Sequence, residues 1–94
     1  MPRTLPDGLE RSGGTPEFTQ DTVPDALRAS HALAAGRWGL LHVISGALVF
    51  VDEETGGESV ITAPAEWNIP SERRHHVRIP EAVTFRIDFY RAPA

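Results

Sequence analysis

The sequence predicts an all-β protein, a small sandwich or barrel built from short strands. Segments rich in β-branched and aromatic residues recur every 8–12 residues or so, with turn signals between them. Glycine and proline are frequent, with eight of each, which is typical of a chain with many turns. A heptad pattern and a long amphipathic helix are both missing from the sequence. At 94 residues, the chain suits one domain.

The first third of the chain contains little regular structure in this interpretation. Residues 1–14 are rich in proline, glycine and charge and are expected to form an irregular lead-in to a single domain over 15–94. Residues 17–20 could form a short extended piece. The alanine-rich stretch 26–36 could be helical or could be a strand and a turn. We therefore expect at most one short helical turn.

Strand patterns dominate from Arg37 onward. Residues 37–46 read as a strand that ends at Gly46. Residues 47–63 read as a hairpin around an acidic, glycine-rich turn, and 66–69 as a short strand between prolines.

The last two segments have the clearest alternation. Over 82–91, apolar residues such as Val83 alternate with polar ones such as Asp88, so the two kinds face opposite sides of a strand. In the extended stretch "RRHHVR" (73–78), the same alternation turns His75 toward the core and His76 outward.

Composition excludes several classes of function. The formal net charge of −4 argues against broad nucleic-acid binding. The chain has no cysteine, so thiolate metal sites and thiol nucleophiles are excluded. No apolar run approaches the roughly 18 residues that span a bilayer, and the N-terminus lacks the apolar core of a signal peptide. We expect a cytoplasmic protein with neither membrane nor nucleic acid as a partner.

Histidine is the side chain with the most chemical potential in this sequence, because imidazole titrates near neutrality and is a common metal ligand. His42 shares a strand face with Leu40 and Ile44. The simplest interpretation of any one histidine is a core-edge residue bonded to backbone. Several histidines converging with a carboxylate, such as Asp88 or Glu66, would instead form a metal site with an open position.

Several blocks of the sequence have a recognisable order and spacing: "TPEFTQDTVPDAL" (15–27), His31, "GRWGLLHVISGALVF" (36–50), "IPSERRHHV" (69–77) and "FRIDFYRAP" (85–93). Together these blocks resemble the TehB/YeaR-like family, small bacterial cupin-fold domains associated with tellurite resistance and stress responses. The resemblance implies a double-stranded β-helix, the cupin jelly roll. It also implies a barrel interior where histidines and a carboxylate commonly bind a divalent metal.

The resemblance implies specific site residues. His31 stands at the first histidine position of the family and His75 at the histidine of its second motif. Leu33 and Leu40 stand at or near the second histidine and glutamate positions, and neither side chain can ligate a metal. Asp88 falls where the family tends to carry an acidic residue.

We therefore expect a metal site at His31 and His75, with His42 and Asp88 as further ligands, that would hold zinc, nickel, iron or manganese. The pocket is expected to be lined by Trp38, Leu40 and Phe85.

Three functions follow from this interpretation. The first is binding of a divalent metal, a small molecule or an anion in the barrel, in a stress or metalloid response. The second is a metal-free, non-catalytic binding domain. The third is an interaction module that acts as a homodimer, an assembly that the resemblance favours. The sequence assigns no catalytic residue.

Overall fold

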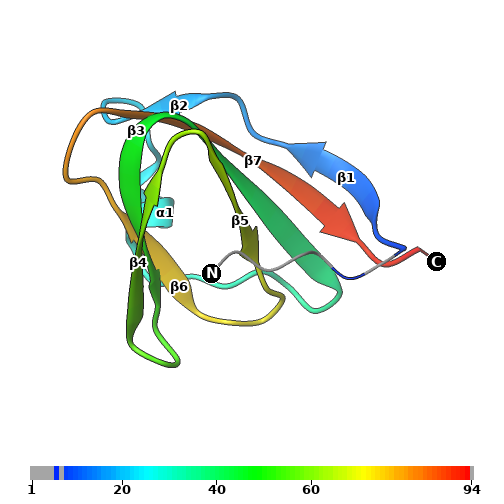
Figure 1. Ribbon diagram of the computed structural model, residues 1–94. Helices are drawn as coiled ribbons and strands as arrows, with labels where there is room; N and C mark the ends of the chain where they lie inside the picture. Colours follow the sequence, from blue (N-terminus) through cyan, green and yellow to red (C-terminus); the bar gives the residue numbers. More distant parts are fainter. Residues whose placement is uncertain (1–5, 7, 94) are drawn as a thin grey trace.

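A computed structural model describes residues 6 and 8–93 of the chain. Within these residues it contains seven strands and one four-residue helix (Figure 1). In chain order the elements are β1 (Glu10–Gly14), β2 (Phe18–Thr19), α1 (Asp25–Arg28), β3 (Arg37–Asp52), β4 (Gly57–Thr62), β5 (Ala65–Ile69), β6 (His75–Arg78) and β7 (Val83–Arg91). Every strand pairing is antiparallel.

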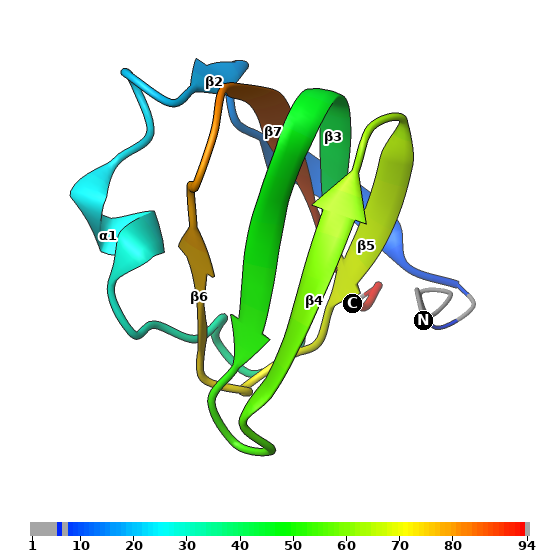
Figure 2. The same cartoon turned by 60° about the vertical axis from the view of Figure 1, so that its left-hand side comes forward.

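The long strand β3 belongs to two layers. Its first half lies between β7 and β5, and its second half lies between β4 and β6. The strands β1 and β2 both pair with β7 and extend the first layer. Figure 2 shows β3 curving from one layer into the other, with α1 beside β6. The chain therefore folds into two facing layers that one continuous strand joins.

The curve in β3 has a local cause. The pairing of β3 with β7 shifts register between Val43 and Ser45, a β-bulge that bends a strand. Gly46 follows with φ of 72°, a left-handed conformation that favours glycine. A Cβ atom at Gly46 would also collide with the carbonyl oxygen of Ala82.

The bulge changes which side chains face the interior. Before it, Leu41 and Val43 are buried in the core; after it, Leu48 and Phe50 are. Odd-numbered residues thus face inward in the first half of β3 and even-numbered residues in the second. This change of phase directs Phe50 and Asp52 toward the space between the layers.

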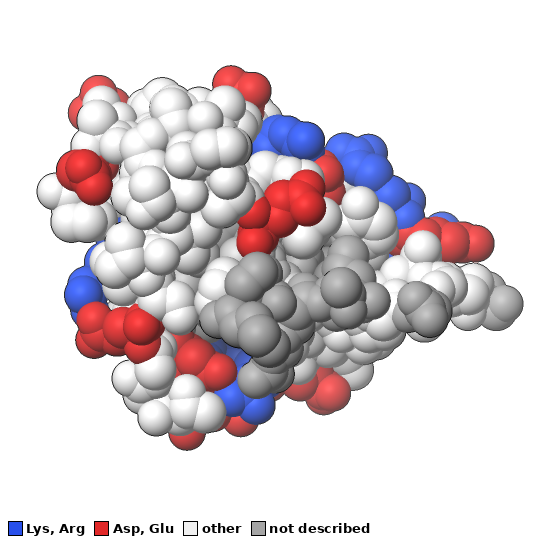
Figure 3. All heavy atoms as spheres, in the orientation of Figure 1, with Lys and Arg blue, Asp and Glu red and all other residues white. Residues whose placement is uncertain are grey.

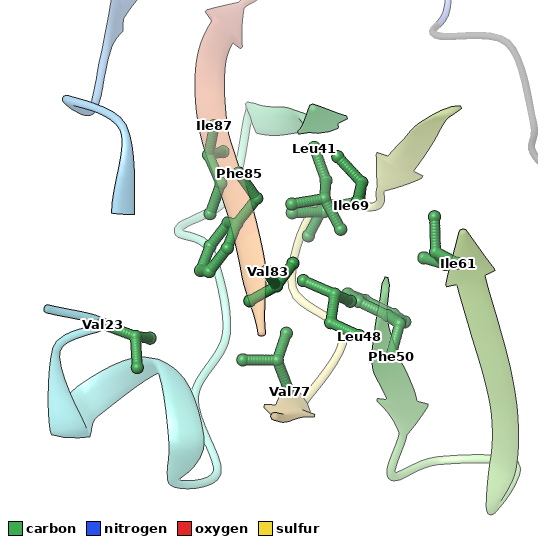
Figure 4. Packing of buried hydrophobic residues seen from close by; sticks show 11 residues of the cluster. Val23, Leu41, Leu48, Phe50, Ile61, Ile69, Val77, Val83, Phe85 and Ile87 are labelled. Atoms are coloured by element: carbon green, nitrogen blue, oxygen red, sulfur yellow. The ribbon is translucent and has the colours of Figure 1, made fainter. Parts of the chain in front are cut away.

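The hydrophobic core lies between the two layers and draws on strands from both (Figure 4). Its buried members are Val23, Leu41, Val43, Leu48, Phe50, Ile61, Ile69, Val77, Val83, Phe85 and Ile87. The inward set predicted for the last strand is confirmed: Val83, Phe85 and Ile87 are buried, and the fourth member, Phe89, is partly buried against the core.

Three expectations about local structure need correction. Residues 10–14, which we placed in the irregular lead-in, form β1; residues 1–5 and 7 of that lead-in lie outside the described part of the chain. Gly46 bends β3 and does not end it. The stretch 26–36 contributes only the end of α1, followed by extended chain. The expected single helical turn is confirmed.

In the described part of the chain, no helix has the length and apolar character needed to cross a membrane.

Candidate functional site

The two histidines expected to form the core of the site lie side by side. The segment before β3 forms an isolated antiparallel bridge to β6 through His31 and His75, with backbone hydrogen bonds of 3.0 and 2.8 Å between them. Their ring centroids are 4.2 Å apart in an edge-to-face arrangement. His75 is buried, as the alternation of β6 predicted, and its ring stacks on Phe50 at 5.1 Å.

Hydrogen bonds decide the tautomer of both rings. Nδ1 of His31 lies 2.8 Å from the carbonyl oxygen of Ala29, and Nδ1 of His75 lies 2.9 Å from that of Arg73. Because a carbonyl oxygen only accepts, Nδ1 carries the proton in each ring. Burial lowers the pKa of His75, and this outweighs the opposing effect of the Arg73 carbonyl. The neutral His75 ring therefore keeps a lone pair on Nε2.

These two rings fit the chemistry of a metal site but do not supply enough ligands for a catalytic one. Histidines that bind metals usually donate the other ring N–H to a carbonyl or carboxylate, as both do here. A catalytic zinc site typically has three protein ligands. Among the described residues, no group of three or more His, Asp or Glu side chains could hold a metal ion.

The other two expected ligands lie elsewhere. His42 and Asp88 face the outer side of the first layer, because the inward positions beside them belong to Leu41 and Ile87. Nε2 of His42 donates to Asp88 at 2.9 Å, while its Nδ1 lies 3.0 Å from Glu66. The expectation that all four residues converge is therefore wrong, since the inside and the outside of the sheet separate them.

Asp88 is the centre of this outer network. Its carboxylate is buried and accepts hydrogen bonds from Arg86 at 2.7 Å and Arg11 at 3.1 Å, besides that from His42. Burial by itself would raise the pKa of Asp88, but the hydrogen bonds from Arg86 and Arg11 outweigh it and the pKa is lowered. The network ties β1 to β7 and β3, which is a structural role.

A cavity of about 260 Å³ opens between the two layers, where β4 lies across from β5. It is lined by Phe50, Asp52, Thr55, Gly57, Ser59, Trp67, Asn68 and Pro70. The expected lining residues Trp38, Leu40 and Phe85 are not among them. Leu40 faces outward with His42, and Phe85 is wholly buried in the core.

The sequence held only a faint signal for this cavity. From the sequence, Trp67 could stack on a ligand, although packing at the core or its rim was the favoured interpretation; in the structure it lies opposite Leu41 on the inner face of β5. Asp52 looked like part of a solvated acidic turn. Because the bulge in β3 changes the phase of alternation, Phe50 and Asp52 could not be assigned to the interior from the sequence.

Asp52 lies at the polar end of the cavity. Arg73 donates to its Oδ2 at 2.7 Å, and the backbone N–H groups of Glu54 and Thr55 donate to Oδ1 at 3.0 and 3.4 Å. Burial alone would raise the pKa of Asp52, but the Arg73 hydrogen bond and these backbone donors lower it. The carboxylate is thus ionised and its charge is compensated.

The remaining cations of the stretch 73–78 make local pairs. His76 lies 2.6 Å from Glu53, and Arg78 donates to Glu58 at 2.8 Å. The outward direction predicted for His76 is confirmed by its partner, and Arg78, on the same face of β6, is exposed. Exposed pairs of this kind contribute little to stability, because water and salt screen them.

Solved structures with the same fold include three bacterial proteins. A protein of Escherichia coli strain K12 matches with a TM-score of 0.89 and 22% identity, covering 98% of this chain and 99% of its own. TehB from Haemophilus influenzae matches with a TM-score of 0.83 and 24% identity, covering 92% of this chain. EutQ of Clostridium difficile matches with a TM-score of 0.53 and 17% identity, covering 69% of this chain and 46% of its own.

These likenesses support the predicted all-β, cupin-like jelly roll. The chain spans 32% of the length of the Haemophilus influenzae protein, so it corresponds to one part of that longer chain. A search of curated proteins finds no match. The profile of the TehB-like domain matches residues 14–87, most of the chain, and the protein therefore belongs to the TehB-like domain family.

Proposed function

We propose that this protein is a small-molecule-binding domain whose ligand enters the cavity between β4 and β5. The cavity itself carries the proposal: aromatic side chains of Phe50 and Trp67 stand beside the polar groups of Asp52, Thr55 and Ser59. Small-molecule sites typically combine an apolar, aromatic lining with a few polar groups that orient the ligand. Membership of the TehB-like family supports a role in a bacterial stress or tellurite response.

The proposal can be tested by NMR titration of ¹⁵N-labelled protein with a library of small, water-soluble compounds. Binding compounds should shift the amide signals of residues 50–59 and 67–70, because these residues surround the cavity. Shifts confined to other parts of the chain, or no saturable shift at millimolar concentration, would contradict the proposal.

A pair of substitutions on neighbouring positions of β4 sharpens this test. Ser59 faces the cavity, whereas the next residue, Val60, is 72% exposed on the outer side. Ser59→Leu should fill part of the cavity and weaken binding at least tenfold. Val60→Leu adds one methylene group on the opposite face and should leave the affinity unchanged. Equal effects of the two substitutions would place the ligand elsewhere.

A second candidate function is binding of a divalent metal by His31 and His75. The observation in its favour is that Nδ1 of each ring donates a hydrogen bond to a carbonyl oxygen. Each Nε2 therefore keeps a lone pair that can bind a metal ion. Two histidines would bind zinc, nickel, iron or manganese weakly, with water or a small ligand in the remaining positions.

Metal titration calorimetry tests this second candidate. We expect His31→Ala and His75→Ala each to reduce the affinity for zinc or nickel at least tenfold. His42→Ala and His76→Ala are matched controls, because their side chains bond to carboxylates away from this pair. If a control weakens binding as much as His75→Ala does, the metal binds at another place.

The homodimer and the cytoplasmic location expected from the sequence stay predictions. Light scattering coupled to size-exclusion chromatography measures the first, and cell fractionation the second.

A further inference from the structure

The cavity offers a ligand an apolar platform made of two aromatic rings. Phe50 is buried, and its ring centroid lies 6.2 Å from that of Trp67 at an interplanar angle of 47°. Aromatic rings offer a large, flat hydrophobic contact surface, and small-molecule sites are lined predominantly by such side chains. A molecule with at least one flat or ring-shaped apolar face would therefore fit this platform.

The polar groups around this platform are mainly neutral hydrogen-bonding groups. Thr55 Oγ1 accepts from the backbone N–H of Gly57 at 3.1 Å, which leaves its hydroxyl proton to donate elsewhere. Within the described part of the chain, neither the Ser59 hydroxyl nor the Trp67 indole N–H has a hydrogen-bond partner. Two hydroxyls and one indole N–H are thus able to bind hydroxyl or carbonyl oxygens of a ligand.

The charges around the cavity disfavour ions of either sign. Among the described residues that line the cavity, Asp52 is the charged one, and it is ion-paired with Arg73 at 2.7 Å, so a cationic ligand would compete with an arginine already in place. An anion would meet the same carboxylate and the acidic turn that follows it, where Glu54 is exposed; Glu58 is nearby but is paired with Arg78. Figure 3 shows acidic side chains near the lower left of the molecule, where the β3–β4 turn lies in Figure 1.

We infer that the ligand is an uncharged, hydroxylated ring compound with the chemistry of a monosaccharide. Its C–H face would pack on Phe50 and Trp67, and its hydroxyl groups would exchange hydrogen bonds with Ser59 and Thr55. A volume of about 260 Å³ lies just below the usual range of about 300–1,000 Å³ for small-molecule sites, which suits a single ring. This inference rests on the proposed function, because it names the ligand class of the same cavity.

The test compares neutral and charged probes of nearly equal shape. We expect D-glucose, D-galactose or myo-inositol to shift the indole N–H signal of Trp67 and to saturate at millimolar concentration. D-Glucuronate and D-glucosamine, which add one negative or one positive charge, should bind at least tenfold more weakly. If a charged probe binds as tightly as its neutral counterpart, or no neutral probe shifts the Trp67 signal, the inference is wrong.

Substitutions with matched controls connect the binding to the cavity. Trp67→Leu should weaken binding of the neutral probe at least tenfold, while Trp38→Leu should leave it unchanged, because Trp38 is outside the cavity lining. Ser59→Ala is the milder change and should weaken binding about threefold to tenfold. Its control is Ser45→Ala, which alters an exposed serine at the bend of β3. If the two variants of either pair bind the neutral probe equally well, the inference is wrong.

The outcomes also separate this inference from the proposed function. If library compounds of other classes bind at residues 50–59 and 67–70 while the sugars do not, the ligand class is wrong and the binding function stands. If no compound of any class binds there, both fail.

Discussion

Gly46 is the residue on which the bend of β3 depends most. Its φ of 72° and the nearby Ala82 carbonyl oxygen leave no room for a Cβ atom. We expect Gly46→Ala to lower the free energy of unfolding by more than about 2 kcal/mol, since it adds a steric clash to the cost of the left-handed conformation. Urea denaturation followed by circular dichroism measures the change.

Gly56 provides the matched control for this substitution. It has nearly the same φ, 75°, but a Cβ atom there would meet nothing within 4 Å. Gly56→Ala should therefore lower the free energy of unfolding by only about 1–2 kcal/mol, which is the cost of the left-handed backbone conformation alone. If the two variants are equally stable, the contact with Ala82 does not matter for the bend.

Asp88 should make the stability depend on pH. Its pKa is lower in the folded protein than the ordinary value of about 4 for an unfolded chain. An acid of this kind stabilises the fold fully at a pH above its pKa in the unfolded chain. This stabilisation is lost as the pH falls through its pKa in the folded protein. The stability difference between the wild type and Asp88→Asn should thus be largest near neutrality and shrink below about pH 4.

Urea denaturation at a series of pH values measures this difference. Asp25→Asn is the control, because Asp25 is exposed at the start of α1, and it should change the stability by no more than about 0.5 kcal/mol. A difference between wild type and Asp88→Asn that stays constant from pH 7 to pH 3 would mean that the outer network does not stabilise the ionised carboxylate.

At the scale of the element, β1 is a weakly attached strand at the edge of the first layer. No residue of Glu10–Gly14 is buried, so backbone pairing with β7 and the Arg11–Asp88 ion pair hold it in place. We expect Arg11→Ala to speed amide hydrogen exchange in β1 by up to about fivefold, because the Arg11 side chain is mostly exposed and its pair with the buried Asp88 carboxylate contributes about 1 kcal/mol or less. Exchange measured by NMR in β3 and β4 should not change.

Arg28→Ala is a suitable control for this experiment, because Arg28 is an exposed residue of α1 far from β1 in the fold. The β1 amides should exchange at the wild-type rate in that variant. Unchanged exchange in Arg11→Ala would show that backbone pairing alone fixes the strand.

At the scale of the whole molecule, the shared strand β3 should make unfolding cooperative. The core cluster combines residues of both layers, and β3 cannot leave one layer without disturbing the other. We expect one transition, with the same midpoint by tryptophan fluorescence and by far-ultraviolet circular dichroism. Two separate midpoints would mean that the layers unfold independently. The single domain expected over 15–94 would then need revision.

The sequence by itself determined the features that depend on local pattern. Alternation in 82–91 identified the inner face of β7, and alternation in 73–78 turned His75 inward and His76 outward, because successive side chains of a strand face opposite sides. The hairpin of β3 and β4 followed from a polar, glycine-rich turn between two apolar runs. The family blocks predicted the jelly roll.

Only the tertiary structure decided two kinds of feature: which side chains of β3 face inward after its bulge, and which strands far apart in the sequence pair with each other. In the apolar run 47–51 every residue is buried, so the sequence could not show that the bulge before Gly46 turns Phe50 and Asp52 inward. His42 and Asp88 were grouped with His31 and His75 from the histidine pattern and the family resemblance, although a sheet separates the two pairs. β1 was missed because its partner strand lies more than 70 residues away along the chain, and no local pattern encodes such a pairing.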